Sequence, residues 1–221
     1  MTLVPQISRL GERAIVLSFP TMDSQQQSLA LQGKLWWFAT ECRHSGDFDD
    51  IVPGMNNLTL FLARDFDISD WESRLQRLWQ QAKYREPDRK RIVIPVIYGG
   101  DSGPDLDSVA KYHALTRAQL IALHSDAEYR VYFLGFLPGF AYLGGLPSRL
   151  HTPRHANPRL MVPAGSVGIG GQMTGIYPSA APGGWQLLGH TQIPLFDPTS
   201  DSPSLLMPGD YVTFSPVEDG T

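Results

Sequence analysis

The stretch Gly135–Trp185 reads GFLPGFAYLGGLPSRLHTPRHANPRLMVPAGSVGIGGQMTGIYPSAAPGGW and is unusually rich in glycine and proline. It holds more than half of the 21 glycines and more than a third of the 18 prolines, so its backbone turns often. Apolar and aromatic residues lie between these turns, whereas a flexible Gly/Ser linker lacks them. Short strands with frequent turns predict a closed or sandwiched β architecture.

The charge pattern around this stretch predicts an anion site. From Tyr129 to Phe196 the chain has no Asp or Glu, yet it carries several Arg and His residues. An Arg fork binds carboxylate or phosphate through two parallel hydrogen bonds. An equally good alternative is that these arginines pair with acids from the N-terminal half of the chain.

Eight residues are candidates for the site. The predicted substrate and anion contacts are Arg154, Arg159 and Ser166, with Tyr142, Tyr177 and Trp185 as pocket walls. His124 and His190 are candidate catalytic groups for proton transfer, and a structural hydrogen-bonding role fits each of them as well.

The order of the expected elements predicts an α+β fold with two domains, 1–86 and 87–221, separated by the polar run 83–91. In the first domain we expect two strands, two helices and a turn, at Ala14–Phe19 and Asn57–Ala63, at Gln25–Glu41 and Ser69–Ala82, and at Ile51–Gly54 respectively.

The second domain is expected to begin with a strand at Ile92–Tyr98, whose Pro95 places it at a sheet edge or a bulge. Asp105 is expected to cap a short helix that ends at His113. The remaining expected elements are a capped helix at Thr116–Ser125, a strand at Tyr129–Leu134, and short apolar pieces at Leu160–Val162, Val167–Ile169, Gln186–Leu188, Leu205–Met207 and Tyr211–Phe214.

Composition excludes several classes of protein. A formal net charge of −4 argues against non-specific nucleic-acid binding, which needs a basic surface. The single cysteine, Cys42, excludes an internal disulfide framework. No basic segment leads into a long apolar run at the N-terminus, so we expect a cytoplasmic protein without membrane contact.

Glycine, serine and histidine motifs for other chemistries fail on spacing. The glycines of 168–175 match neither dinucleotide nor Walker phosphate loops, and Ser166 lacks the glycine two residues before it that a nucleophile elbow needs. His151 and His155 are separated by Pro153 and cannot share one helical face. We therefore predict no metal site in this chain.

Several motifs together resemble the carboxyltransferase-type, subdomain C and D family. This family includes the B subunit of prokaryotic 5-oxoprolinase, the Kip-type histidine-kinase inhibitor, and allophanate hydrolase subunit 1-like proteins. The resemblance spans nearly the whole chain and rests on residues 98–106, 135–146, 153–159, 162–167, 175–178 and 182–185. It implies a small α+β N-terminal domain followed by a cyclophilin-like β-barrel domain.

The resemblance also implies a function. We expect a B-type subunit that acts with a larger homologous C subunit and a separate A subunit in ATP-dependent hydrolysis of 5-oxoproline, a small cyclic amide, to glutamate. ATP is the expected cofactor of the complex, no biotin is expected, and a need for Mg is left open. The resemblance does not decide which component binds ATP or whether the isolated chain is active.

Two departures from the family pattern bear on the site. His190 stands where the family tends to have Arg, and Ala180-Ala181 precede Pro182 where the family often has Ser-Pro. The alternative functions are a Kip-type regulator that inhibits a sensor histidine kinase and a carboxyltransferase-like component of the allophanate and urea pathway.

Overall fold

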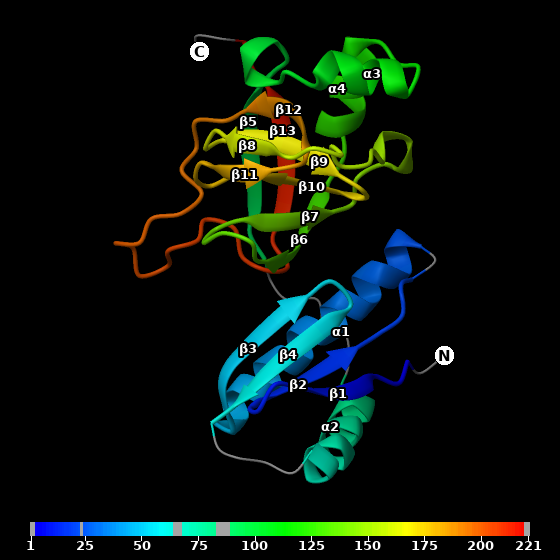
Figure 1. Cartoon of the computed structure of the whole chain (residues 1–221), viewed down its shortest axis with the longest axis vertical. Coiled ribbons are helices and arrows are strands. Elements are labelled where there is room, and N and C mark those ends of the chain that lie inside the picture. The colour runs from blue at the N-terminus through cyan, green and yellow to red at the C-terminus, as the bar shows by residue number, and fades with distance from the viewer. Residues whose placement is uncertain (1–2, 23, 64–67, 83–88, 219–221) are drawn as a thin grey trace. The chain divides into compact units, whose positions relative to one another are not determined.

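The computed structural model describes residues 3–22, 24–63, 68–82 and 89–218 and divides the chain into two compact units, Met1–Asp88 and Arg89–Thr221. Both units contain helices and strands (Figure 1). Each unit has its own apolar core. The expected domain boundary between residues 86 and 87 lies outside the described residues. No helix of the described part is long and apolar enough to span a bilayer.

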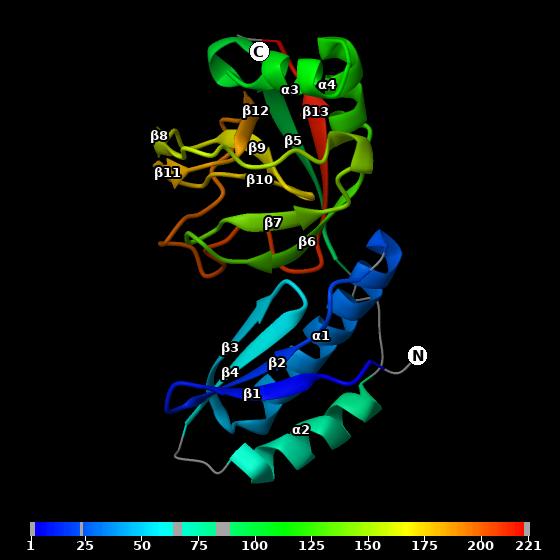
Figure 2. The same cartoon turned by 45° about the vertical axis from the view of Figure 1, so that its right-hand side comes forward.

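The first unit is a four-stranded antiparallel sheet in the order β1-β2-β4-β3 with two helices (Figure 2). Its elements are β1 (Gln6–Leu10), β2 (Ala14–Ser18), α1 (Gln25–Ser45), β3 (Phe48–Gly54), β4 (Asn57–Leu62) and α2 (Ile68–Gln81). Leu58, Leu60 and Leu62 are buried on one face of β4, as their alternation predicts, and they share one core cluster with residues of both helices.

The sequence interpretation of this unit is wrong at β3 and misses β1. Ile51–Gly54, expected as a turn, belongs to β3, and the chain turns instead at Met55 and Asn56. Because β3 is an edge strand, it tolerates Pro53, although proline is also typical of turns. Strand β1 is almost entirely exposed, so no alternation of apolar residues marks it.

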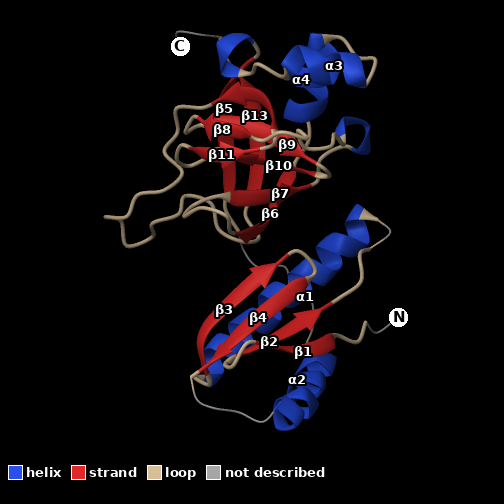
Figure 3. Ribbon diagram, viewed as in Figure 1, coloured by secondary structure: helices blue, strands red, loops and turns tan. Residues whose placement is uncertain are grey.

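The second unit is a closed seven-stranded barrel in the order β10-β7-β6-β13-β5-β12-β9, with a separate two-stranded sheet of β8 and β11 (Figure 3). The predicted α+β class with a closed β architecture is therefore confirmed. Its elements are β5 (Arg91–Tyr98), η1 (Gly100–Ser102), α3 (Leu106–Tyr112), α4 (Arg117–Ser125), β6 (Tyr129–Leu134), β7 (Ala141–Gly144), η2 (Ser148–Leu150), β8 (Arg159–Val162), β9 (Ser166–Gly170), β10 (Met173–Ile176), β11 (Ala181–Gly183), β12 (Gln186–His190) and β13 (Tyr211–Pro216).

Parallel pairing of β5 with β13 closes the barrel. The ladder runs over six residue pairs, from Arg91↔Tyr211 to Val96↔Pro216. The expectation that Pro95 lies at a sheet edge or a bulge is wrong, because β5 lies between β13 and β12. The ladder with β12 reaches only Ile97 and Tyr98, so a proline in the middle of β5 interrupts no pairing on that side.

The start of α4 agrees with its expected structure, whereas Leu205–Met207 does not. The capping box of Thr116 and Gln119 is present at the start of α4. Leu205–Met207 forms no strand, although Leu206 is fully buried; the neighbouring Ser204 makes only an isolated bridge with Phe196. A short apolar piece can therefore belong to the core without pairing to a strand.

Trp79 of α2 is the largest fully buried side chain of the first unit. Its ring lies 4.6 Å from that of Phe19 and 5.5 Å from that of Phe38, and its Nε1 donates a 2.7 Å hydrogen bond to the carbonyl of Leu3. The ring thus fastens the N-terminal segment and α1 to α2.

We expect Trp79→Ala to lower the free energy of unfolding by about 3–5 kcal/mol, because it opens a cavity and leaves the Leu3 carbonyl without its donor. Urea denaturation followed by far-UV circular dichroism measures this. The control is Leu78→Ala, since the neighbouring Leu78 is 38% exposed and should cost about 1 kcal/mol or less. Equal losses in the two variants would contradict the assignment.

Candidate functional site

The barrel unit contains an open cavity of about 390 Å³ between the loop that follows β5 and strand β8. Strands β9 and β12 also contribute residues to its lining. The lining residues combine apolar and polar side chains: Asp101, Ser102, Pro104, Arg159, Met161, Pro163, Ser166, Leu187 and His190. Three of the predicted site residues, Arg159, Ser166 and His190, therefore share one cavity.

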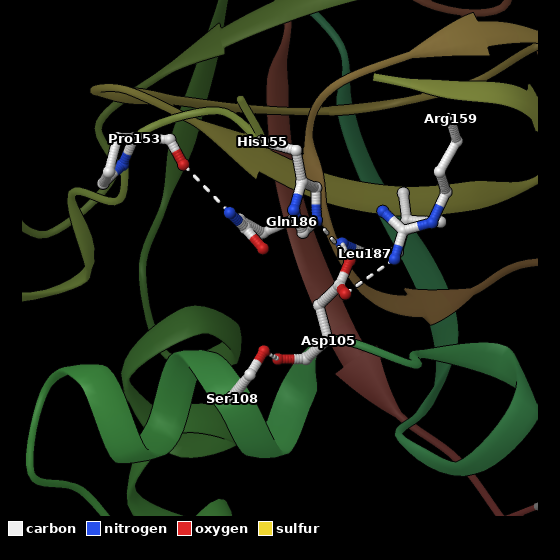
Figure 4. Close-up of polar contacts among 7 residues, drawn as sticks. All are labelled: Asp105, Ser108, Pro153, His155, Arg159, Gln186 and Leu187. Carbon is white, nitrogen blue, oxygen red and sulfur yellow. Dashed lines mark hydrogen bonds and ion pairs between the residues drawn. The ribbon is translucent and has the colours of Figure 1, made fainter. Parts of the chain in front are cut away.

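Asp105 holds the wall of this cavity together (Figure 4). Its Oδ1 accepts a 2.7 Å hydrogen bond from Nη2 of Arg159, and its Oδ2 accepts one of 2.7 Å from the backbone N–H of Leu187. Nε2 of His155 lies 3.3 Å from the same Oδ2. A single carboxylate thus joins the start of α3 to β8, β12 and the segment before β8.

Asp105 remains an anion in this environment. Burial by itself would raise the pKa of its carboxyl group, but the hydrogen bonds from Arg159, Leu187 and His155 outweigh burial and hold the pKa below its ordinary value. Asp105 stands at the N-cap of α3, as expected. Its side chain makes no capping bond, because both of its oxygens bind elsewhere.

Glycine at position 103 lets the loop after β5 approach β12 closely. A Cβ there would overlap the carbonyl of Leu188, and the N–H of Gly99 donates to that same carbonyl at 3.0 Å. Asp105 then continues the contact, since its own N–H donates to the Leu187 carbonyl at 3.0 Å. This backbone contact brings the Asp105 carboxylate to β12.

Arg159 is only partly satisfied by Asp105. Its side chain is 30% exposed, and its Nη1 is buried with no hydrogen-bond partner among the described residues. The structural alternative of pairing with an acid therefore holds for Nη2 of Arg159, whereas Nη1 keeps a donor without an acceptor.

A second group of predicted residues forms an aromatic cluster beside Arg159. Phe140 lies at its centre, with ring centroids 5.3 Å from Tyr177, 5.5 Å from Trp185 and 4.9 Å from Tyr142. The exposed Arg154 places its guanidinium carbon 5.9 Å from the ring centroid of Trp185. The five predicted residues Arg154, Arg159, Tyr142, Tyr177 and Trp185 thus lie in one region.

The electrostatic couplings agree with this proximity. Burial raises the pKa of Tyr177, and the Trp185 N–H and the positive charges of Arg154 and Arg159 oppose that rise. Burial likewise raises the pKa of Tyr142 against the charge of Arg154. Both phenols are therefore neutral at physiological pH, so they add no negative charge to this region.

Ser166 and His190 are held in register by neighbouring strands. They are paired residues of β9 and β12, and Nε2 of His190 lies 2.9 Å from the carbonyl of Ala164. Gly165, the residue before Ser166, has φ +81°, and a Cβ there would overlap the carbonyl of Thr191. The glycine turn thus sets Ser166 and His190 side by side at the cavity.

His124 lies apart from these residues. It is fully buried inside the barrel core, where its ring stacks on Phe214 at 4.6 Å. Thr174 Oγ1 donates to the carbonyl of Gly168, so it accepts from Nε2–H of His124 at 2.9 Å. Nδ1 is then left to accept from the Tyr98 hydroxyl at 2.7 Å. His124 therefore has the structural hydrogen-bonding role and cannot reach the cavity.

Sequence reasoning missed the roles of Asp105 and His155. Asp105 lies in one of the family motifs, but its position before an apolar run is typical of a helix cap and carries no signal of pairing with Arg159. The spacing of His155 from His151 suggests only a test for metal ligation. Among the described residues, no group of three or more His, Cys, Asp or Glu side chains is placed to hold a metal ion.

Almost the whole chain is similar to proteins of one known family. The family model for the carboxyltransferase domain, subdomain C and D, matches residues 5–206. The 5-oxoprolinase B subunit of Escherichia coli O157:H7 is 50% identical over 96% of this chain and 95% of its own length. The Bacillus subtilis protein of the same name is 38% identical over 97% and 93%. The solved structure of a conserved uncharacterized protein from Pyrococcus horikoshii is 40% identical, with a TM-score of 0.58 over 97% of this chain and 98% of that one.

The buried His124 predicts a specific pH dependence of stability. Burial lowers its pKa to about 3, so between pH 3 and about 6.5 the unfolded chain binds a proton that the folded chain does not. The free energy of unfolding should therefore fall as the pH drops below about 6.5, with this group contributing up to about 1.4 kcal/mol per pH unit.

Urea unfolding of the wild type and of His124→Gln across this pH range measures that contribution. The variant should be less stable at pH 7.5 and should show a smaller slope below pH 6.5. Ser148→Ala, which changes an exposed residue of the same unit without removing a titrating group, is the control and should keep the wild-type slope. An unchanged slope in His124→Gln would show that another group carries the acid sensitivity.

Proposed function

Since this chain belongs to the carboxyltransferase family, subdomain C and D, we propose that it is the B subunit of a 5-oxoprolinase complex that hydrolyses 5-oxoproline to glutamate with ATP. The observation that carries the proposal is 50% identity to a 5-oxoprolinase B subunit over nearly the full length of both chains. The proposed partners are a larger C subunit and a separate A subunit.

The chemistry of the proposed reaction calls for an anion site. A lactam is a poor electrophile, so transfer of the γ-phosphoryl group of ATP to its oxygen would create a leaving group before water opens the ring. Substrate carboxylate and phosphate then have to be held close to each other. The cavity at Arg159 and the exposed Arg154 beside the aromatic cluster are the features of this chain that support such a role.

The cavity suits the small substrate better than the nucleotide. The charge of Arg159 is largely balanced by Asp105, and Asp101 adds a further carboxylate to the lining. A triphosphate needs several donors and a net positive surface. We therefore propose that the ATP phosphates are bound mainly by another component of the complex.

A Kip-type regulator remains the second candidate because of an apolar surface beside the cavity. Leu160 is 90% exposed and Met161 64% exposed, and they are neighbours on β8. Apolar side chains this exposed are typical of protein contacts. They fit a partner of the enzyme complex and a kinase target equally well, so an assay has to separate the two functions.

Reconstitution is the test of the proposed function. The purified chain mixed with its candidate A and C partners should release glutamate from 5-oxoproline only when ATP is present. Omission of this chain should abolish turnover. Glutamate is measured by an enzyme-coupled assay, and inactive, heat-treated chain is the control. No turnover from the full set, together with binding of this chain to a sensor kinase, would favour the regulator.

A further inference from the structure

Asp105 and Arg159 form a built site that points to a ligand beyond the residues themselves. The Asp105 carboxylate is almost completely buried and has every contact that its oxygens need, whereas Nη1 of Arg159 is buried with no acceptor among the residues described. Leaving one N–H donor of an arginine unpaired is costly inside a protein. Because the Arg159 side chain also lines the open cavity, a turn of its guanidinium could bring this donor to an acceptor held there.

We propose that this cavity is the subsite for the carboxylate of a small cyclic or amino-acid substrate, with Arg159 as the contact and Asp105 as the positioning residue. The assignment rests on the proposed function and deepens it by naming the group that is recognised. Both 5-oxoproline and glutamate carry such a carboxylate.

The negative charges of Asp105 and Asp101 beside Arg159 disfavour a phosphate, which carries more negative charge than the single carboxylate of 5-oxoproline. Asp105 occupies Nη2 and leaves one edge of the guanidinium, which offers one or two donors to a single oxygen or carboxylate. The apolar part of the lining, from Pro104, Met161 and Leu187, can pack against ring methylenes. Ser102, Ser166 and His190 remain for the polar amide end of the ligand.

Binding requires a small turn of the guanidinium. Nη1 is buried in the present arrangement, so the side chain has to rotate about its contact with Asp105 to present this donor to the cavity. The 30% exposure of the Arg159 side chain gives room for that turn. Because Asp105 is fixed by Leu187 and His155, the ion pair can act as the pivot and survive the movement.

Ligand titrations of the isolated full chain test the subsite. Wild-type protein labelled with ¹⁵N is titrated with 5-oxoproline, glutamate, inorganic phosphate and 2-pyrrolidinone, which has the same ring without the carboxylate. We expect 5-oxoproline to bind at least about tenfold more tightly than 2-pyrrolidinone, with shifts at cavity residues, as one charge-assisted hydrogen bond predicts. The glutamate arm shows whether substrate, product or both use the subsite.

The double variant Asp105→Asn/Arg159→Gln removes both charges and keeps amides that can still bond, so it should fold like the wild type. It should lose the preference for 5-oxoproline over 2-pyrrolidinone. Asp105→Asn alone keeps the arginine but loosens it, and should reduce the preference by a smaller factor. Arg149→Gln, at an exposed residue away from the lining, is the matched control and should leave the preference unchanged.

Several outcomes would overturn the subsite. These are no saturable binding of 5-oxoproline by the wild type up to roughly 10 mM, tighter binding of phosphate than of either carboxylate, or an unchanged preference in the folded double variant. In the assembled complex, the double variant should raise the KM for 5-oxoproline more than it lowers kcat. Turnover with an unchanged KM would reject the subsite and leave the proposed function standing. If the double variant loses the preference but no complex with the wild-type chain turns over 5-oxoproline, the subsite stands and the proposed function is rejected.

Discussion

The bonds of the Asp105 carboxylate are the constraint on which the candidate site depends. One buried anion accepts from the Leu187 N–H, Nη2 of Arg159 and Nε2 of His155, and so it joins three segments that lie far apart in the sequence, at residues 105, 155–159 and 187. Removal of a single partner would leave a buried charge or an unpaired donor, which costs more than the bond itself contributes. The cavity wall is therefore held as a unit and not residue by residue.

Much of the fold could be predicted from the sequence because its signals are local. The alternation of Leu58, Leu60 and Leu62 and the capping box at Thr116 depend only on nearby residues, and both are present in the structure. Elements at sheet edges were harder, since β1 is exposed on most of its length and β3 carries a proline that an edge strand can accept. The parallel closure of β5 on β13 depends on residues more than a hundred positions apart, for which no local signal exists.

The sequence predicts which residue types line the site, but not which of these residues bond to one another. Seven of the eight candidates lie in the acid-free window, and the structure places these seven in one region of the barrel unit. The eighth, His124, precedes the window and is buried in the core. Composition does not predict that Asp105, an acid outside that window, pairs with Arg159. Asp105 has the local sequence of a helix cap, and only the approach of its loop to β12 turns its carboxylate toward Arg159. The two candidate histidines likewise differ only in three-dimensional burial.

The parallel ladder between β5 and β13 also governs when the barrel can form during synthesis. The first strand of this unit needs the strand at Tyr211–Pro216 beside it, so the ring of strands stays open until that segment has left the ribosome. Until then, the apolar interior built by strands such as β9 and β6 has no complete wall around it. In the first unit the pairing between the strands most distant in the sequence, β2 and β4, needs only residues up to Leu62, so its sheet can be complete much earlier. The nascent barrel is thus the part of this protein that most needs protection from aggregation.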